Sequence, residues 1–145
     1  MAGIVLSINI SEKKGTPKTK INPGVLIENF GFEGDAHAGK WHRQVSLLAK
    51  ESIVKSLNDP KDGLCHGVFA ENITTEGIEL YTLPVGTRLQ VGECIIEISQ
   101  IGKECHEGCA ISKLVGKCVM PREGVFATVI KGGKIFDGDI IKVIE

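Results

Sequence analysis

The sequence has few aromatic residues, no long apolar run and no excess of charge of either sign. Phe, Trp and Tyr make up 5% of the 145 residues, so the core must be built mainly from Ile, Val and Leu. The longest apolar stretches span a few residues, far fewer than the ~20 that a membrane helix requires. Because the net charge is −1 and no basic face is evident, nucleic acid is an unfavourable partner.

Several familiar motifs are missing as well. Residues 1–7 lack the positively charged start of a secretory signal and are typical of a first strand. The five cysteines are unevenly spaced, which favours free thiols in a reducing cytoplasm over a disulfide framework. The sequence contains no Gly-x-Ser-x-Gly elbow, so a Ser-His-Asp hydrolase has no support. A Gly-rich phosphate loop of either standard kind is missing too.

Short apolar segments between turns predict a fold made mainly of strands. Ile4, Leu6, Ile8 and Ile10 fall on alternate positions, which is the period of a strand. Further strands are predicted at 25–27, 45–48, 68–74, 87–91, 94–100, 124–130 and 140–144. A helix is predicted at 49–57, with Ile53, Val54 and Leu57 on one face, and a helical turn at 109–115. We therefore expect a single domain over residues 1–145, a mainly β, barrel-like or sandwich fold with one or two short helices.

Residues 11–24 stand apart from these strands. They are polar, include two prolines and follow the first strand directly. Such composition predicts a mobile excursion, or a loop that is ordered only by contact with a partner.

Polar side chains capable of chemistry are concentrated between glycines in residues 31–43. Asp35 and His37 lie two residues apart, and His42 and Arg43 follow. A guanidinium group suits phosphate or carboxylate groups, and an imidazole ligates metals or carries protons near neutral pH. The segment therefore predicts a binding loop. The alternative is structural: Asp35 caps a turn through its own backbone and Arg43 pairs with it.

A second polar pair, Glu71 and Asn72, interrupts a strand-like segment. Burying a carboxylate and an amide without partners is costly, so a place on the wall of a cleft would explain them. The alternative is a hydrogen-bonded strand end at the surface.

The cysteines differ in their surroundings. Cys94 lies in an apolar strand and is predicted to fill the core, whereas Cys65 has no clear role. Cys105, Cys109 and Cys118 lie among lysines, and cations lower the pKa of a thiol. Cys105 is the preferred reactive thiol because it follows a strand directly. A structural zinc site built from these cysteines and His106 is the alternative, although their spacing departs from the paired Cys-x-x-Cys pattern.

Together these segments resemble a MOSC domain, named after the C-terminal domain of molybdenum cofactor sulfurase. The resemblance extends over residues 3–145 and rests on the order and spacing of several short segments. These are Gly31-Phe32-Glu33-Gly34-Asp35-Ala36-His37, 43–48, 67–74, 83–87, 91–92, 98–100 leading to Cys105, 124–129 and 138–139.

The resemblance implies a β-rich, partly barrel-like fold with a cleft cysteine that carries sulfur as a persulfide or ligates molybdenum. Cys105 matches the family cysteine best, with Cys109 and Cys118 as alternatives. The residues that fall on the family's polar cleft motifs are Asp35, His37, Arg43, Glu71 and Asn72. Arg43 would suit the phosphate of the molybdenum cofactor (molybdopterin), and Asn72 its pterin edge. Pyridoxal phosphate belongs to the separate lyase domain of the sulfurases and is not expected on this chain.

Three functions remain open at this stage. The first is a module that binds the molybdenum cofactor or accepts sulfur from a partner such as a cysteine desulfurase. The second is a standalone molybdenum-dependent reductase of N-oxidised compounds, which the small size of the chain disfavours. The third is a non-catalytic scaffold whose cysteines hold a structural zinc.

Overall fold

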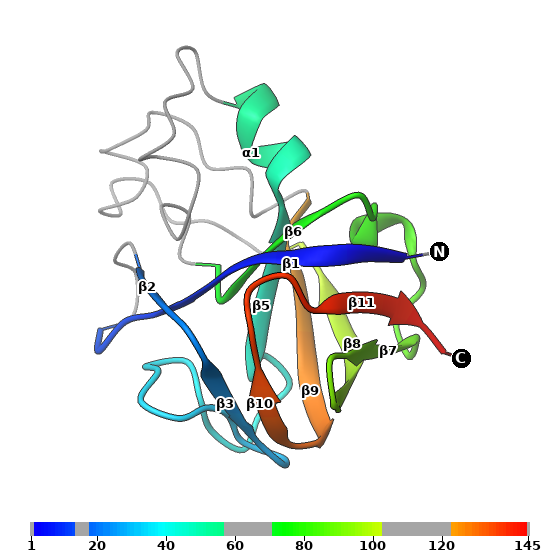
Figure 1. The fold of residues 1–145 in the computed structure, drawn as a ribbon. Coiled ribbons are helices and arrows are strands. Elements are labelled where there is room, and N and C mark those ends of the chain that lie inside the picture. The colour runs from blue at the N-terminus through cyan, green and yellow to red at the C-terminus, as the bar shows by residue number, and fades with distance from the viewer. Residues whose placement is uncertain (1, 14–17, 57–70, 103–122, 145) are drawn as a thin grey trace.

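The computed structural model describes residues 2–13, 18–56, 71–102 and 123–144, and their dominant feature is a closed β-barrel (Figure 1). Seven strands form the ring in the order β11-β7-β8-β9-β5-β6-β1, and pairing of β11 with β1 closes it. Their bounds are β1 Ala2–Ile10, β5 Val45–Ala49, β6 Ile73–Glu76, β7 Arg88–Val91, β8 Cys94–Ile101, β9 Val125–Lys131 and β11 Ile140–Val143. All neighbours in the ring are antiparallel except β5 and β6. The prediction of a mainly β, barrel-like fold is confirmed.

Smaller elements cover this barrel. Strand β2 (Thr19–Ile21) pairs with the end of β1, and a separate sheet has the order β10-β3-β4. Its strands are β3 (Gly24–Ile27), β4 (Gly31–Phe32) and β10 (Gly133–Ile135). Gly24 marks a close approach to the barrel, since a Cβ there would lie 2.7 Å from the side chains of both Ile8 and Phe32. Helix α1 (Lys50–Ser56) directly follows β5, and a 3₁₀ turn, η2, covers Leu80–Thr82.

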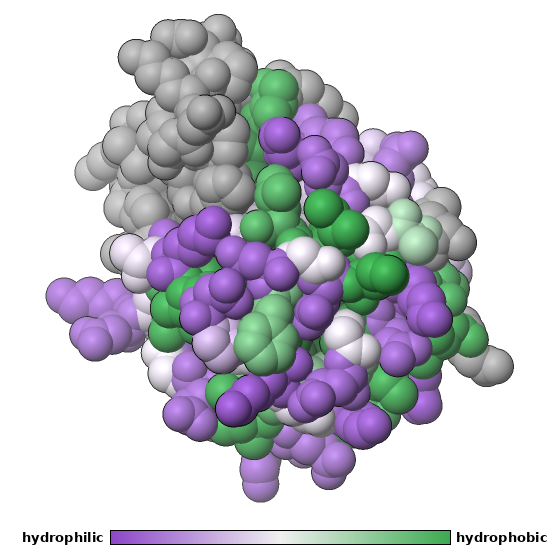
Figure 2. Space-filling model, viewed as in Figure 1, coloured by the Kyte–Doolittle hydropathy of each residue, from purple (hydrophilic) through white to green (hydrophobic). Residues whose placement is uncertain are grey.

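Aliphatic side chains fill the barrel, as the scarcity of aromatics predicts. Along β8, Cys94, Ile96 and Ile98 are fully buried and their neighbours are not, which is the alternation of a strand with one face inward. On the face viewed in Figure 2, hydrophobic residues lie over β1 and β11 among hydrophilic ones. Ile4 and Ile140, which are cross-strand partners there, are 38% and 59% exposed.

Strand β1 differs from its predicted alternation. Val5 and Ile8 are both fully buried, although they lie three residues apart, whereas Ile4 is substantially exposed. A β-bulge against β6, between Val5 and Ser7, inserts a residue and reverses which side chains face inward. The period-2 pattern thus identifies the strand and the inward position of Ile8, but before the bulge it points to Ile4 where Val5 is buried.

Other boundaries also shift. Residues 11–24 are not simply an excursion, because residues 19–21 form strand β2. The strand predicted at 68–74 corresponds to β6, which begins at Ile73. Residues 68–70 lie outside the described residues. Between the strands predicted at 124–130 and 140–144, Gly133–Ile135 form a further strand, β10. The helix prediction is confirmed at Lys50–Ser56, with Ile53 buried but Val54 38% exposed. The helical turn predicted at 109–115 lies outside the described residues.

Candidate functional site

The loop between β4 and β5 contains three of the six predicted site residues, Asp35, His37 and Arg43, and Gln44 fixes its base. The Gln44 Oε1 accepts the N–H of Val129 on β9 at 2.9 Å, and its Nε2 donates to Asn29 Oδ1 at 3.0 Å. Gly31 has a φ of 127°, and a Cβ there would lie 2.6 Å from the Gln44 carbonyl oxygen. Only glycine fits at this position, so the local sequence itself directs the loop back against the barrel.

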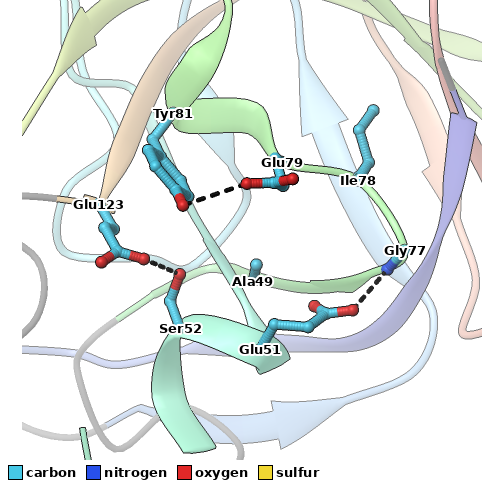
Figure 3. Close-up of a pocket in the computed structure, with 8 residues that line it drawn as sticks. All are labelled: Ala49, Glu51, Ser52, Gly77, Ile78, Glu79, Tyr81 and Glu123. Atoms are coloured by element: carbon cyan, nitrogen blue, oxygen red, sulfur yellow. Dashed lines mark hydrogen bonds between the residues drawn. The ribbon is translucent and has the colours of Figure 1, made fainter. Parts of the chain in front are cut away.

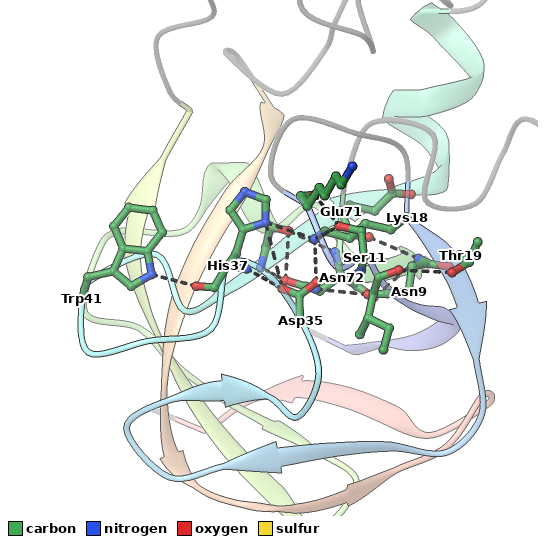
Figure 4. A network of polar contacts seen from close by, with 12 residues as sticks. Asn9, Ser11, Lys18, Thr19, Asp35, His37, Trp41, Glu71 and Asn72 are labelled. Atoms are coloured by element: carbon green, nitrogen blue, oxygen red, sulfur yellow. Dashed lines mark hydrogen bonds and ion pairs between the residues drawn. The ribbon is translucent and has the colours of Figure 1, made fainter.

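Within this loop, Asp35 forms a buried ion pair with Lys18 (Figure 4). Lys18 Nζ lies 2.6 Å from Asp35 Oδ1, and both side chains are 0% exposed. The backbone N–H of Ser11 donates to the same Oδ1 at 3.1 Å, and that of His37 donates to Oδ2 at 3.1 Å. These contacts join the 31–43 loop to the chain on both sides of residues 14–17. The cationic partner of Asp35 is therefore Lys18, so the alternative in which Arg43 pairs with Asp35 is wrong, although Asp35 does accept from the backbone of its own turn.

Two opposing effects act on the Asp35 carboxyl group. Burial raises its pKa because the charged form loses water. The hydrogen bond and positive charge of Lys18, with hydrogen bonds from Ser11 and Asn72, outweigh this and hold the pKa below the ordinary value of 3.8. Asp35 is therefore a carboxylate at neutral pH.

His37 lies beside this pair. Its Nδ1 is 3.0 Å from Lys18 Nζ and 4.0 Å from Asp35 Oδ2, and its side chain is 19% exposed. Trp41 Nε1 donates to the His37 carbonyl oxygen at 2.8 Å. The backbone and one ring nitrogen of His37 are thus held in place, and Figure 4 shows its other ring nitrogen directed away from the ion pair.

Arg43 lies between two aromatic rings. Its guanidinium carbon is 4.7 Å from the centroid of Trp41 and 5.6 Å from that of Phe126 on β9. Its Nε is buried and has no hydrogen-bond partner among the residues that the structure describes. A buried donor without an acceptor is costly, so this position favours an acceptor supplied by a ligand.

Glu71 and Asn72 precede β6 and are both 0% exposed, which excludes the predicted alternative of a surface strand end. The Asn72 Oδ1 accepts from Ser46 N at 2.9 Å and from Ser46 Oγ at 3.2 Å, and its Nδ2 donates to the Asn9 carbonyl oxygen at 3.1 Å. Thr74 Oγ1 donates to Glu71 Oε2 at 2.7 Å. Both side chains are therefore engaged in contacts within the protein.

A further contact joins the loop to the end of β8. His42 Nε2 and Gln100 Oε1 are 2.7 Å apart, and Gln100 Nε2 donates to the Gly102 carbonyl oxygen at 2.7 Å. Ser99 Oγ also donates to the carbonyl oxygen of His42. Residue 102 is the last described residue before the segment that contains Cys105.

The structure brings Asp35 and His37 of the 31–43 loop together with Asn72, which precedes β6. Arg43 lies farther along the 31–43 loop. Cys105, Cys109, Cys118 and Cys65 lie outside the described residues. Lys18 was missed because it lies in a polar stretch with two prolines, where nothing in the local pattern indicates burial. Cys94 is buried as predicted, and burial together with Glu93 and Asp139 raises the pKa of its thiol to about 11.

A separate pocket of about 420 Å³ lies between α1 and η2 (Figure 3). Three glutamates line it, each already engaged. Glu51 accepts from Gly77 N at 3.0 Å, Glu79 from Tyr81 at 3.2 Å and Glu123 from Ser52 at 2.5 Å. Across the described part of the chain, no group of three or more His, Cys, Asp or Glu side chains is arranged to hold a metal ion. In that same part, no helix is long and apolar enough to span a membrane.

The closed barrel, with the polar 31–43 loop packed against it, defines the structural class of this chain. The YuaD protein of Bacillus subtilis superposes with a TM-score of 0.78 at 16% identity, over 99% of this chain and 96% of that one. YiiM of Escherichia coli superposes with a TM-score of 0.67 at 21% identity, over 100% of this chain and 70% of that one. YiiM of Geobacillus stearothermophilus superposes with a TM-score of 0.73 at 19% identity, over 99% of this chain and 75% of that one. At these identities the likeness establishes the fold alone.

The family is established by sequence. The MOSC domain family model matches residues 34–142, which is most of the chain, so the protein belongs to the MOSC domain family. That family is known for binding the molybdenum cofactor. No curated protein sequence matches the chain.

Proposed function

We propose that this MOSC domain binds the molybdenum cofactor through the 31–43 loop and uses Cys105 as the thiolate that ligates molybdenum or carries sulfur. The observation that carries the proposal is Arg43. Its guanidinium group is held over two rings, and its buried Nε has no acceptor within the described part of the chain. A planar fork of N–H donors matches the oxygens of a phosphate group, which the cofactor carries.

The remaining predicted residues take different parts in this proposal. His37 adds a partly exposed polar ring from within the loop. Asp35, Glu71 and Asn72 are engaged with Lys18, Thr74, Ser46 and Asn9, so we assign them to holding the loop and β6 in place. When bound, the cofactor supplies a molybdenum ion able to accept a thiolate ligand.

The sulfur-carrier form of the proposal needs no external oxidant. The Cys105 thiolate attacks the terminal sulfur of a persulfide on a partner such as a cysteine desulfurase. The partner's S–S bond breaks, a new S–S bond forms on Cys105, and the partner leaves as a thiolate. This step requires an accessible thiolate, which the lysines near Cys105 in the sequence favour.

Sulfur transfer is tested by intact-protein mass spectrometry after incubation with a cysteine desulfurase and cysteine. We expect the wild type to gain the mass of one sulfur atom and Cys105→Ser to gain none. Cys109→Ser and Cys118→Ser are matched controls that should load normally. Loading of Cys105→Ser together with failure of either control would move the thiol to that control position.

Cofactor binding is tested on protein purified from cells that make the cofactor. We expect molybdenum and pterin to co-purify with the wild type and to fall at least tenfold in Arg43→Ala. Arg88→Ala is the matched control, because Arg88 forms an exposed ion pair with Glu97 on the barrel. Equal cofactor content in the two variants would contradict the role of Arg43. Zinc without molybdenum in the wild type would favour the scaffold hypothesis instead.

A further inference from the structure

Three acceptors among the described residues lie within hydrogen-bond distance of the Lys18 ammonium group. Asp35 Oδ1 lies at 2.6 Å, His37 Nδ1 at 3.0 Å and Ser11 Oγ at 3.1 Å. An ammonium group has three N–H donors and no lone pair, so these three contacts suffice to engage all of its donors. Lys18 is therefore occupied within the protein and acts on the site through the residues that it contacts.

The charge of Lys18 follows from its surroundings. Its side chain is fully shielded from water, and the carboxylate at 2.6 Å is likewise 0% exposed. A buried carboxylate whose pKa is held below its usual value remains charged, and the paired ammonium compensates that charge. Neutralising either member alone would leave the other charge buried without a partner, so the two charges are maintained together.

A charged Lys18 determines the protonation of His37. Two nitrogens 3.0 Å apart form a hydrogen bond only if one of them offers a lone pair, and the ammonium has none. His37 Nδ1 must therefore be the acceptor, which leaves the ring proton on Nε2. Protonating Nδ1 as well would direct an N–H at the ammonium, while the carboxylate oxygen of Asp35 is more distant, at 4.0 Å.

From this geometry we infer that Lys18 and Asp35 are positioning residues that hold His37 as a neutral imidazole with its proton on Nε2. In this state the Nδ1 lone pair is engaged by Lys18 and Nε2 is an N–H donor, so the ring acts neither as a base nor as a metal ligand. Any part that this donor takes in cofactor binding rests on the proposed function, whereas the state of the ring does not. The Nε2 nitrogen points away from the ion pair, as such a donor requires (Figure 4).

The state of the ring is read directly from ¹⁵N-labelled full-length protein at pH 7, without cofactor. Long-range ¹H–¹⁵N spectra distinguish protonated from unprotonated ring nitrogens, and His37→Gln assigns the His37 signals among the four histidines. We expect a single species with an unprotonated Nδ1 and a protonated Nε2. Two protonated nitrogens, or a proton on Nδ1, would overturn the inference.

The role of the ion pair has its own readouts. In the wild type, the Lys18 amine should appear as a slowly exchanging, charged ammonium group, and a neutral amine there would contradict the inference. The double variant Lys18→Met/Asp35→Asn removes both charges together, so that neither is left unpaired. We expect its His37 signals to change from one tautomer to a mixture; an unchanged spectrum would show that the ion pair does not position the ring.

These results are separable from those of the proposed function. If sulfur loading and cofactor binding both fail but His37 shows the Nε2-protonated form, the proposed function falls and the inference on His37 stands. If loading succeeds and His37 is cationic, the reverse holds.

Discussion

At the scale of single residues, the ion pairs differ in how far the fold removes their charges from water. The Lys18–Asp35 pair is fully buried, whereas Arg88 and Glu97 form an ion pair at 3.1 Å whose side chains remain 48% and 35% exposed. Exposed pairs contribute about 0–1 kcal/mol, because water and salt screen them. Removing one partner of a buried pair costs about 3–5 kcal/mol, since the other charge is left uncompensated.

Asp35→Asn should therefore destabilise the protein by about 3–5 kcal/mol at pH 7. The folded-state pKa of Asp35 lies below 3.8, under the unfolded value of about 3.9, so its contribution is present above that pH and is lost as pH falls through the folded pKa. The difference between wild type and variant should accordingly shrink in acid. Urea unfolding at neutral and acidic pH measures both effects.

Glu97→Gln is the matched control for this measurement. It removes a carboxylate from the exposed pair, and we expect a change within about 1 kcal/mol at pH 7. If Asp35→Asn were as mild as Glu97→Gln, the ion pair with Lys18 would not be a stabilising contact in solution.

The site residues differ in how readily the sequence reveals them. Asp35, His37 and Arg43 are predictable because they are concentrated between glycines in one loop. Lys18 is not, because its burial depends on Asp35, which lies 17 residues away along the chain. For Glu71 and Asn72 the sequence signals an unusual polar pair, but only tertiary contacts show that both are buried.

At the scale of elements, Asn72 joins strands that are distant in sequence. Its backbone and side chain together contact Ser46 on β5 and Asn9 on β1, the two neighbours of β6 in the barrel. Asn72 lies directly before the first residue of β6. Its side-chain hydrogen bonds there link β5 and β1, as backbone pairing does along β6 itself. Such a contact lies outside any local sequence pattern, as does the bulge in β1.

Replacing Asn72 with alanine should destabilise the protein by about 2–5 kcal/mol, because the Ser46 N–H and the Asn9 carbonyl each lose a buried partner. Urea unfolding at neutral pH measures the loss. Gln90→Ala is the control, since Gln90 makes a single partly buried hydrogen bond to Gly92, at 3.3 Å. Equal losses in the two variants would mean that the Asn72 contacts contribute no more than an ordinary partly buried hydrogen bond.

At the scale of the whole molecule, composition and periodicity predict a mainly β fold but not the closure of the barrel. Closure depends on pairing of β1 with β11, whose partners are separated by most of the chain, as in Ala2 with Lys142. The small β10-β3-β4 sheet is equally non-local, and the sequence signals only its short strand at 25–27. Long-range pairings of this kind leave no trace in a local window of sequence.

The barrel and the site loop should unfold as one unit. The loop is tied to the rest of the chain by the Lys18–Asp35 pair, by the hydrogen bond from Val129 N on β9 to Gln44, and by the His42–Gln100 contact. Trp41, the single tryptophan, donates to His37 and lies against Arg43, so its fluorescence reports on this loop. Far-UV circular dichroism reports on the strands instead.

We expect the two signals to give coincident urea transitions, as a two-state domain requires. Because the loop is fastened to the barrel by buried charges and buried hydrogen bonds, opening it alone would expose most of those groups at once. Trp41→Phe should abolish the fluorescence transition while leaving the circular dichroism transition in place, which confirms the origin of the signal. A fluorescence transition at lower urea than the dichroism transition would show that the site loop opens independently, and that the barrel alone is the cooperative unit.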